Sequence, residues 1–325
     1  MGDHSLGRVI CVAGPTASGK TELAIDLALR LGGEVCSCDS MQIYREMDIG
    51  TAKPDIEERK GISHHMIDII NPDEDYSVAR YVEEASAVVD DILARGRVPV
   101  IVGGTGLYMD ALIRGLHFSN GQNSDILRGR IEKLYDRFGG ERLYSHLRSL
   151  DPAAAEKTHP NDRKRVCRAL EVYYGSKTTI SSHNEKTREL PLRYNAVYVG
   201  LNYKNRQLLY DRINERVDKM FSSGLVEEVR GLIEKYELSA TAAQAIGYKE
   251  IINTIEKGLP LETAADEIKR ATRRYSKRQL TWFRRNKSIN WFYRDLQKHE
   301  DILQASTDYF LRDEYNRREK DNIDN

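Results

Sequence analysis

The chain has 325 residues, of which 40% are hydrophobic and 31% are charged, a balance typical of a globular protein with a sizeable core. Its four cysteines are too few for a disulfide scaffold, its apolar runs are too short to span a bilayer, and its polar N-terminus is unlike a signal peptide. The 50 basic and 50 acidic residues cancel, so a uniformly basic surface is excluded, whereas a segregated one is not. We therefore expect a cytoplasmic protein that does not contact membranes.

The first third of the chain alternates short apolar runs with amphipathic segments. Strands are predicted at 9–13, 34–39 and 98–102, and helices at 21–31, 78–94 and from 106 to about 114. This rhythm predicts an α/β core with a mostly parallel sheet, whose first part covers 1–117.

The rhythm then stops, and residues 118–194 contain no convincing strand. Helices are predicted there at 124–138, 141–150, 152–158 and 161–174, with Asp151 and Asn161 as caps. We interpret this stretch as a helical lobe inserted between two strands of the core.

The core is expected to resume over 195–311 and to be followed by a tail. The predicted elements are a strand at 196–200, helices near 205–222 and 225–236, a loop at 239–248, a long helix at 261–285 and a strand at 289–293. The polar tail at 312–325 is expected to be frayed or disordered.

A phosphate-binding loop follows the first strand and matches the pattern G-x-x-x-x-G-K-[ST]. Its glycines let backbone N–H groups surround phosphate oxygens, and the helix that follows adds its dipole. Lys20 would neutralise phosphate charge, and Thr21 is placed to bind Mg²⁺. The eight residues are Gly14, Pro15, Thr16, Ala17, Ser18, Gly19, Lys20 and Thr21.

Two further segments follow predicted strands. Asp39 ends a strand expected beside the phosphate loop, where it could bind Mg²⁺ or act as a general base, although an ordinary turn aspartate remains an equal alternative. Thr105 lies in a second glycine-rich turn, which could offer backbone N–H groups and the Thr105 hydroxyl to an anion, although tight packing of strand against helix is the commoner explanation. The strand before that turn lacks the terminal aspartate usual in P-loop NTPases, which weakens the case for plain ATP hydrolysis.

The helix at 261–285 is strongly basic, since nine Lys or Arg residues lie between Lys269 and Lys287 without an acidic residue. An apolar stripe should pack inward, whereas two basic rows should be exposed and favour a nucleic-acid partner over an acidic protein or membrane. Arg212 and Arg216, in contrast, are expected to be surface arginines paired with neighbouring acids. The stripe is Ala264, Ile268, Ala271, Tyr275 and Trp282, and the rows are Lys269, Arg273, Lys277 and Arg270, Arg274, Arg278.

Several motifs together make the chain resemble the bacterial tRNA dimethylallyltransferases. Besides the phosphate loop GPTASGKT, they are DSMQIY with DIGTAKP, GGTGLY, NDRKRVCRALE, QAIGYKE and TRRYSKRQLTWF, in order along nearly the whole chain. The resemblance implies a P-loop NTPase-like core with an inserted helical tRNA-binding lobe. It also implies transfer of a dimethylallyl group from dimethylallyl diphosphate to N6 of the adenosine 3′-adjacent to the anticodon, in tRNAs that read codons beginning with U.

The resemblance also implies roles for individual residues. The phosphate loop would hold the diphosphate of the donor together with Mg²⁺ at Thr21, and Asp39, Thr105 and Arg216 would be catalytic.

The partner would be the tRNA anticodon arm, and we expect a monomer. A P-loop small-molecule kinase and a non-catalytic RNA-binding NTPase remain the alternatives. The residues implied to touch tRNA are Asp39, Ser40, Met41, Gln42, Thr105, Arg128, Lys164, Arg165, Val166, Cys167, Arg168, Gln244, Ala245, Ile246, Gly247, Tyr248, Lys277 and Arg278.

Overall fold

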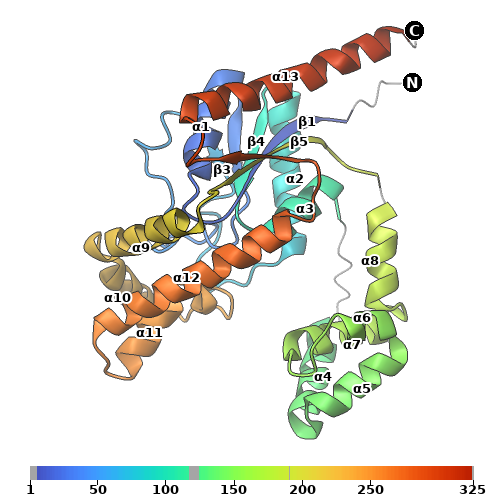
Figure 1. Cartoon of the computed structure of the whole chain (residues 1–325). Helices are drawn as coiled ribbons and strands as arrows, with labels where there is room; N and C mark the ends of the chain where they lie inside the picture. The colour runs from blue at the N-terminus through green and yellow to red at the C-terminus, as the bar shows by residue number, and fades with distance from the viewer. Residues whose placement is uncertain (1–5, 117–123, 190, 324–325) are drawn as a thin grey trace. The chain divides into compact units, whose positions relative to one another are not determined.

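The computed structural model describes residues 6–116, 124–189 and 191–323 (Figure 1). The chain forms two compact units, one from Met1–Gly115 with Leu192–Asn325 and one from Leu116–Pro191. The second unit corresponds to the expected inserted lobe, although Tyr194, the last residue predicted for that lobe, belongs to the first unit.

A six-stranded, entirely parallel sheet forms the centre of the first unit. Its strand order is β3-β2-β4-β1-β5-β6, which confirms the predicted α/β class. Cys11 of β1 pairs with Ile101 on one side and Tyr198 on the other, so β1, which leads into the phosphate loop, is central. The strands are β1 Arg8–Ala13, β2 Glu34–Ser37, β3 His64–His65, β4 Pro99–Gly103, β5 Asn195–Asn202 and β6 Ile289–Tyr293.

Helices cover both faces of this sheet (Figure 1). Ile10 and Val12 share one buried cluster with Leu27 and Phe310, from the helices α1 and α13. Helices α2 and α3 pack together near β2 and β4, where the rings of Tyr81 and Tyr108 stack 4.5 Å apart. Ile10 and Val12 face the same side of the sheet because successive side chains along a strand point to opposite faces. The four helices are α1 Lys20–Leu31, α2 Val78–Ala94, α3 Gly106–Arg114 and α13 His299–Ile323.

Four more helices and a short 3₁₀ turn complete the first unit. α12 packs on α9 through an ion pair of Lys269 with Asp218 at 2.5 Å and a hydrogen bond from Arg273 to Asn214 at 2.6 Å. α11 is absent from the prediction because its β-branched residues weaken the helical signal, whereas burial of its Ile251 stabilises it. The elements are α9 Arg206–Ser222, α10 Leu225–Lys235, η1 Ala242–Gln244, α11 Tyr248–Glu256 and α12 Leu261–Phe283.

The second unit is a helical lobe with a core of its own, built around Ile131, Leu147 and Leu170. Asp151 caps α6 as predicted, since it accepts a hydrogen bond from the Ala154 amide at 3.0 Å. The predicted cap Asn161 is wrong, because α7 begins later and Asp162 caps it. The helix α8 is also absent from the prediction. The helices are α4 Ser124–Phe138, α5 Gly140–Leu150, α6 Pro152–Glu156, α7 Arg163–Ser176 and α8 Ile180–Glu189.

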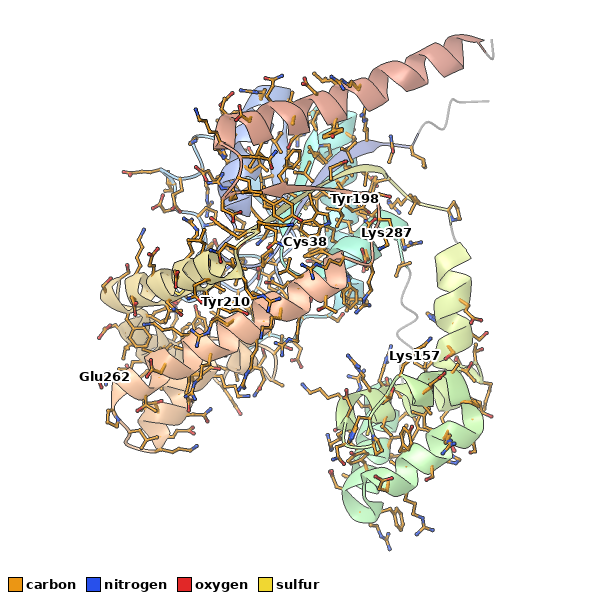
Figure 2. The ribbon with its side chains drawn as sticks, in the orientation of Figure 1. Cys38, Lys157, Tyr198, Tyr210, Glu262 and Lys287 are labelled. Carbon is orange, nitrogen blue, oxygen red and sulfur yellow. The ribbon has the colours of Figure 1, made fainter. Side chains whose placement is uncertain are left out.

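The expected frayed tail is helical instead, because the backbone of residues 312–323 continues α13. Arg, Glu and Lys in this stretch have high helix propensity, and the helix is already anchored through Leu303 and Phe310. In the first unit, Tyr198 lies on β5, and Cys38, which follows β2, is buried (Figure 2). Within the described residues, no helix combines the length and the apolar composition needed to cross a membrane.

Candidate active site

The phosphate loop has the predicted arrangement, because it connects the buried strand β1 to the first turn of α1. Gly14 and Gly19 have φ values of 147° and 84°, which residues with a Cβ atom rarely adopt. The Lys20 ammonium and the Ser18 hydroxyl donate to the Pro15 carbonyl at 2.6 and 2.8 Å. Lys20 therefore lies over the loop, beside the N-terminus of α1, in a position to meet an anion.

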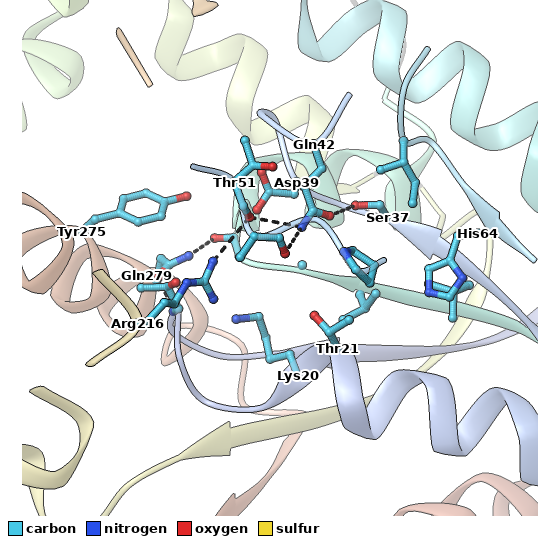
Figure 3. A pocket seen from close by; sticks show the side chains of 18 residues that line it. Lys20, Thr21, Ser37, Asp39, Gln42, Thr51, His64, Arg216, Tyr275 and Gln279 are labelled. Carbon is cyan, nitrogen blue, oxygen red and sulfur yellow. Dashed lines mark hydrogen bonds between the residues drawn. The ribbon is translucent and has the colours of Figure 1, made fainter. Parts of the chain in front are cut away.

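A cavity of about 80 Å³ lies beside the loop (Figure 3). A larger outer pocket of about 810 Å³ shares Lys20, Thr21 and Arg216 with it. The inner cavity thus places a carboxylate, which can accept a proton, next to cations and hydroxyls, which can bind an anion. Its polar lining includes Lys20, Thr21, Ser37, Asp39, Thr51, Arg216, Tyr275 and Gln279.

Asp39 reaches this cavity, although not in the way predicted. β2 ends at Ser37, and β4 lies between β2 and β1, so Asp39 neither ends a strand nor neighbours the phosphate-loop strand. Its Oδ1 atom accepts a hydrogen bond from the Met41 amide at 2.9 Å, which makes a local turn. The turn holds the carboxylate in the crevice that it shares with Lys20.

Thr105 is joined to the Asp39 segment through the glycine-rich turn. Its Oγ1 atom accepts a hydrogen bond from the Ser40 amide at 3.2 Å. A Cβ atom at Gly103 would lie 2.0 Å from the Cys38 carbonyl oxygen, so only glycine lets the two segments approach this closely. Tight packing, the commoner explanation for such turns, is therefore what brings Thr105 against the Asp39 segment, although Thr105 itself does not line the cavity.

Arg212 is exposed as predicted, whereas Arg216 is half-buried, and the hydrogen bonds of both go to backbone carbonyls instead of the expected acids. Arg216 donates to the Thr51 carbonyl at 3.4 Å, and Arg212 donates to the Ala17 carbonyl at 3.2 Å. Both side chains turn toward the phosphate loop and line the outer pocket. The sequence did not indicate these contacts, because acidic residues on the same helix were nearer candidate partners for both arginines.

Burial and mutual repulsion disfavour the charged forms of the two cations at the site. Burial and the neighbouring Arg216 charge lower the pKa of Lys20 to about 7, and Asp39 only partly opposes them. Burial likewise lowers the pKa of Arg216. An anion bound between these groups would favour their charged forms, so this end of the cavity is suited to an anion.

Mg²⁺ fits the site only together with a ligand. The described residues contain no cluster of three or more His, Cys, Asp or Glu side chains suited to a metal ion. Thr21 and Asp39, however, offer a hydroxyl and a carboxylate to the cavity that Lys20 lines. Mg²⁺ is commonly held by one or two such groups together with substrate phosphates, so the donor set suits a metal bound with a phosphate ester.

Tyr275 and Gln279 of α12 are site residues that sequence reasoning did not assign. Gln279 was not among the residues expected to face inward, yet only 5% of it is exposed. Tyr275 lines the cavity, and its pKa is raised to about 12, first by burial and next by the Asp39 carboxylate. The available signal was their spacing of four residues on the helix, which places both on one face.

The basic helix exposes one of the two predicted rows. Arg270, Arg274 and Arg278 are exposed, and so is Lys277, whereas Lys269 and Arg273 are half-buried against α9. The guanidinium of Arg278 lies 5.5 Å from the centre of the Tyr275 ring, which links the exposed face to the cavity lining. Of the apolar stripe, Ala264 and Ile268 are buried, while Ala271, Tyr275 and Trp282 are half-buried.

The loop at 244–248 divides into exposed and buried positions. Gln244 is exposed and Ile246 half-buried, whereas Ala245, Gly247 and Tyr248 are buried. The Tyr248 hydroxyl donates to Glu228 at 2.6 Å, so this side chain supports the fold and cannot contact RNA as implied.

Ser40, Met41 and Gln42 follow Asp39 and are half-buried. The Gln42 amide accepts from the Ser37 hydroxyl at 3.0 Å and donates to the Ala52 carbonyl at 3.3 Å. It therefore holds the cavity wall together.

The lobe exposes only some of the residues that the resemblance implied to touch tRNA. Lys164, Arg165 and Arg168 are exposed on α7, whereas the side chains of Val166 and Cys167 are 0% and 2% exposed and belong to the core of the lobe. A ligand therefore cannot touch those two side chains. Arg128 and Arg168 both form ion pairs with Glu171, at 3.1 and 2.8 Å.

Comparison with known families and proteins finds related sequences along most of the chain. The IPP transferase family matches residues 42–286 of the chain, and the isopentenyl transferase family matches residues 7–72. The tRNA dimethylallyltransferase of Caldanaerobacter subterraneus is 47% identical over 306 residues, which are 93% of this chain and 97% of the relative. That of Acetivibrio thermocellus is 47% identical over 94% of this chain and 98% of its own length.

Solved structures are similar as well. The tRNA isopentenylpyrophosphate transferase of Bacillus halodurans has a TM-score of 0.68 and 40% identity, covering 95% of this chain and 99% of its own. A eukaryotic dimethylallyltransferase acting on tRNA has a TM-score of 0.71 and 31% identity, covering 85% of this chain and 70% of its own.

Proposed function

Since this chain belongs to the IPP transferase family, we propose that it is a tRNA-modifying enzyme that moves a dimethylallyl group from dimethylallyl diphosphate to tRNA. The acceptor would be N6 of the adenosine on the 3′ side of the anticodon, in tRNAs that read codons beginning with U. The observation that carries the proposal is the cavity that joins Asp39 to the phosphate loop and Arg216.

The donor would bind with its diphosphate on the loop, near Lys20 and Arg216. Backbone N–H groups at the start of α1 and these two cations would stabilise the charge that grows on the leaving diphosphate. Mg²⁺, held by Thr21 and the phosphate oxygens, would supply additional electrostatic stabilisation of that group. The Thr105 hydroxyl would lie near the reacting groups.

Asp39 would act as the general base. The exocyclic nitrogen of adenine is a weak nucleophile, because its lone pair is delocalised into the ring. As the new N6–C1 bond forms, the C1–O bond breaks and diphosphate leaves with the electron pair, while the N6 proton passes to the Asp39 carboxylate. The reaction balances without a redox partner.

The RNA would contact several exposed cationic and polar side chains. An adenosine must leave its stack to enter a cavity, which costs a few kcal/mol, and contacts elsewhere on the anticodon arm can offset that cost. The exposed side chains that would make such contacts are those of Gln244, Lys277 and Arg278 in the first unit and Lys164, Arg165 and the Glu171-paired Arg128 and Arg168 in the lobe. The site of action would be the cytoplasm, where tRNA is modified.

The decisive experiment incubates the purified protein with unmodified tRNA and dimethylallyl diphosphate, followed by mass spectrometry of the RNA fragments. We expect one added C5H8 unit on an adenosine of the anticodon arm. ATP in place of the prenyl donor should leave the tRNA mass unchanged. Phosphorylation of a small molecule, or ATP hydrolysis without any RNA product, would instead favour a kinase or an RNA-binding NTPase.

A further inference from the structure

Gln279 is a buried amide in the middle of the site, and the proposed prenyl transfer assigns no role to it. Its Oε1 atom accepts a hydrogen bond from the Thr16 amide at 2.8 Å, and its Nε2 atom donates to the Gly104 carbonyl at 3.0 Å. Thr16 belongs to the phosphate loop, and Gly104 directly precedes Thr105. One side chain from α12 therefore connects the loop that would bind diphosphate to the turn that carries Thr105 (Figure 3).

The surroundings of Gln279 are shaped to fit this amide. A Cβ atom at Gly104 would lie 2.0 Å from Nε2, so glycine at that position is what lets the amide reach the backbone. An amide presents a donor and an acceptor at opposite sides, and both are satisfied here. A carboxylate of the same shape could make only the bond to Thr16, and a hydrocarbon could make neither.

The connection extends from Gln279 to the proposed base. Thr105 Oγ1 accepts from the Ser40 amide, and Ser40 follows Asp39. One helical turn before Gln279, Tyr275 lines the same cavity, and the side chains of Thr105 and Gln279 both act to lower the pKa of its hydroxyl. The spacing between the diphosphate loop and Asp39 is thus fixed through α12, the helix whose opposite face is basic.

We propose that Gln279 is a positioning residue for prenyl transfer, whose amide sets the distance between the donor's diphosphate and the acceptor side of the cavity. This inference rests on the proposed function. Group transfer requires the attacking nitrogen and the donor carbon to approach within about 3–3.5 Å, and a displacement of about 1 Å can cost about 100-fold in rate. Loss of the bridge should therefore slow the chemical step more than it weakens tRNA binding.

The test compares single-turnover rates at saturating donor and tRNA for wild type, Gln279→Met, Gln279→Glu and Ser276→Ala. Ser276 is a matched control, because it is 1% exposed on the same helix and its hydroxyl donates only within that helix, to the Arg273 carbonyl. We expect Gln279→Met to lower the single-turnover rate about 10- to 100-fold, while the Kd for tRNA stays within about twofold. Ser276→Ala should remain close to wild type in both measurements.

The Gln279→Glu variant supplies a readout that a merely structural role would not move. A protonated carboxyl group can imitate the amide, since its O–H can donate to Gly104 and its C=O can accept from Thr16. Burial raises the pKa of a carboxyl group, so the rate relative to wild type should rise as the pH falls from about 8 to about 6. The same ratio for Gln279→Met should be flat.

Three outcomes would overturn the inference. The first is a Gln279→Met rate within about twofold of wild type. The second is a parallel loss of rate and tRNA affinity in both Gln279→Met and Ser276→Ala. The third, which decides if Gln279→Met does not fold, is a Gln279→Glu ratio independent of pH. Failure of the proposed function is distinguishable, because wild type itself would then give no prenylated tRNA.

Discussion

At the scale of single residues, the chemistry depends on a carboxylate that a local turn holds beside two cations. Asp39 accepts from the Met41 amide and lines the cavity with Lys20 and Arg216. An asparagine at this position keeps an oxygen for the Met41 amide but cannot accept the N6 proton. The substitution therefore separates the support of the turn from the acceptance of a proton.

We predict that Asp39→Asn lowers the single-turnover rate by about 10²- to 10⁴-fold, the usual contribution of a general base. The affinities for donor and tRNA should change far less, because the turn survives. Asp55→Asn is the matched control, since Asp55 is an exposed aspartate of the outer pocket whose carboxylate likewise accepts from a backbone amide, that of Glu58. A wild-type rate in Asp39→Asn would exclude the role of general base.

Lys20 leads to a prediction about pH. Its pKa in the free protein is about 7, because burial and the Arg216 charge disfavour the ammonium form. A bound diphosphate favours that form and raises the pKa, so the complex takes up a proton between the two pKa values. Donor affinity should be greatest below pH 7 and should fall as the pH rises above it, by up to about tenfold per pH unit.

Calorimetry of donor binding in buffers with different ionisation enthalpies checks this proton uptake near neutral pH. Lys20→Arg is the control, because arginine stays charged across this pH range. In that variant, only the titration of the donor itself should affect binding. Equal pH profiles for wild type and Lys20→Arg would contradict the assignment.

At the scale of elements, α12 has two faces with different tasks. One face contacts α9 and the site loops through Lys269, Arg273 and Gln279, and the other exposes Lys277 and Arg278. Like charges at i, i+4 repel, so an exposed basic face without acids is typical of a helix that meets a polyanion.

We predict that Lys277→Ala combined with Arg278→Ala raises the Kd for tRNA and leaves donor binding unchanged. Each lost phosphate contact should make the dependence of log K on log salt shallower by about 0.7. Isotherms at several salt concentrations measure both effects. The control is Arg30→Ala, because Arg30 is in the last turn of α1, remote from the phosphate loop at the other end of that helix. An unchanged Kd and salt slope would indicate a merely solvated face.

At the scale of the whole molecule, the chain consists of two units with separate cores. The chain leaves and re-enters the first unit at neighbouring positions, because the Arg193 amide donates to the Ile113 carbonyl at 2.9 Å. A short linker can therefore replace the lobe without stretching the core.

We predict that replacing residues 116–191 with a short Gly/Ser linker leaves a folded core that binds the donor as tightly as the full chain. Its affinity for tRNA should fall about tenfold or more, through loss of the exposed cations of α7. Calorimetry with the donor and filter binding with tRNA measure the two affinities. Wild-type tRNA affinity in the shortened protein would remove the lobe from the RNA-binding surface.

Features set by neighbouring residues were predictable from the sequence alone. The phosphate loop, the helix at 78–94 and the inserted helical region follow from local periodicity and from backbone preferences of glycine, which act over a few residues. The motifs were likewise sufficient for the family. Asp39 and Thr105 were identified as candidates from their turns after predicted strands, Arg216 was identified only by resemblance, and the roles of all three remain predictions.

Only the tertiary structure decided which side chains meet and which are buried. β4 lies between β2 and β1, Tyr248 and Val166 are inside, and Arg212 and Arg216 turn toward the phosphate loop. Gln279 bonds to Thr16 across 263 positions of sequence, and no local pattern records such a pairing. The reason is physical: helical and strand preferences depend on near neighbours, whereas burial and hydrogen-bond partners depend on how distant elements pack.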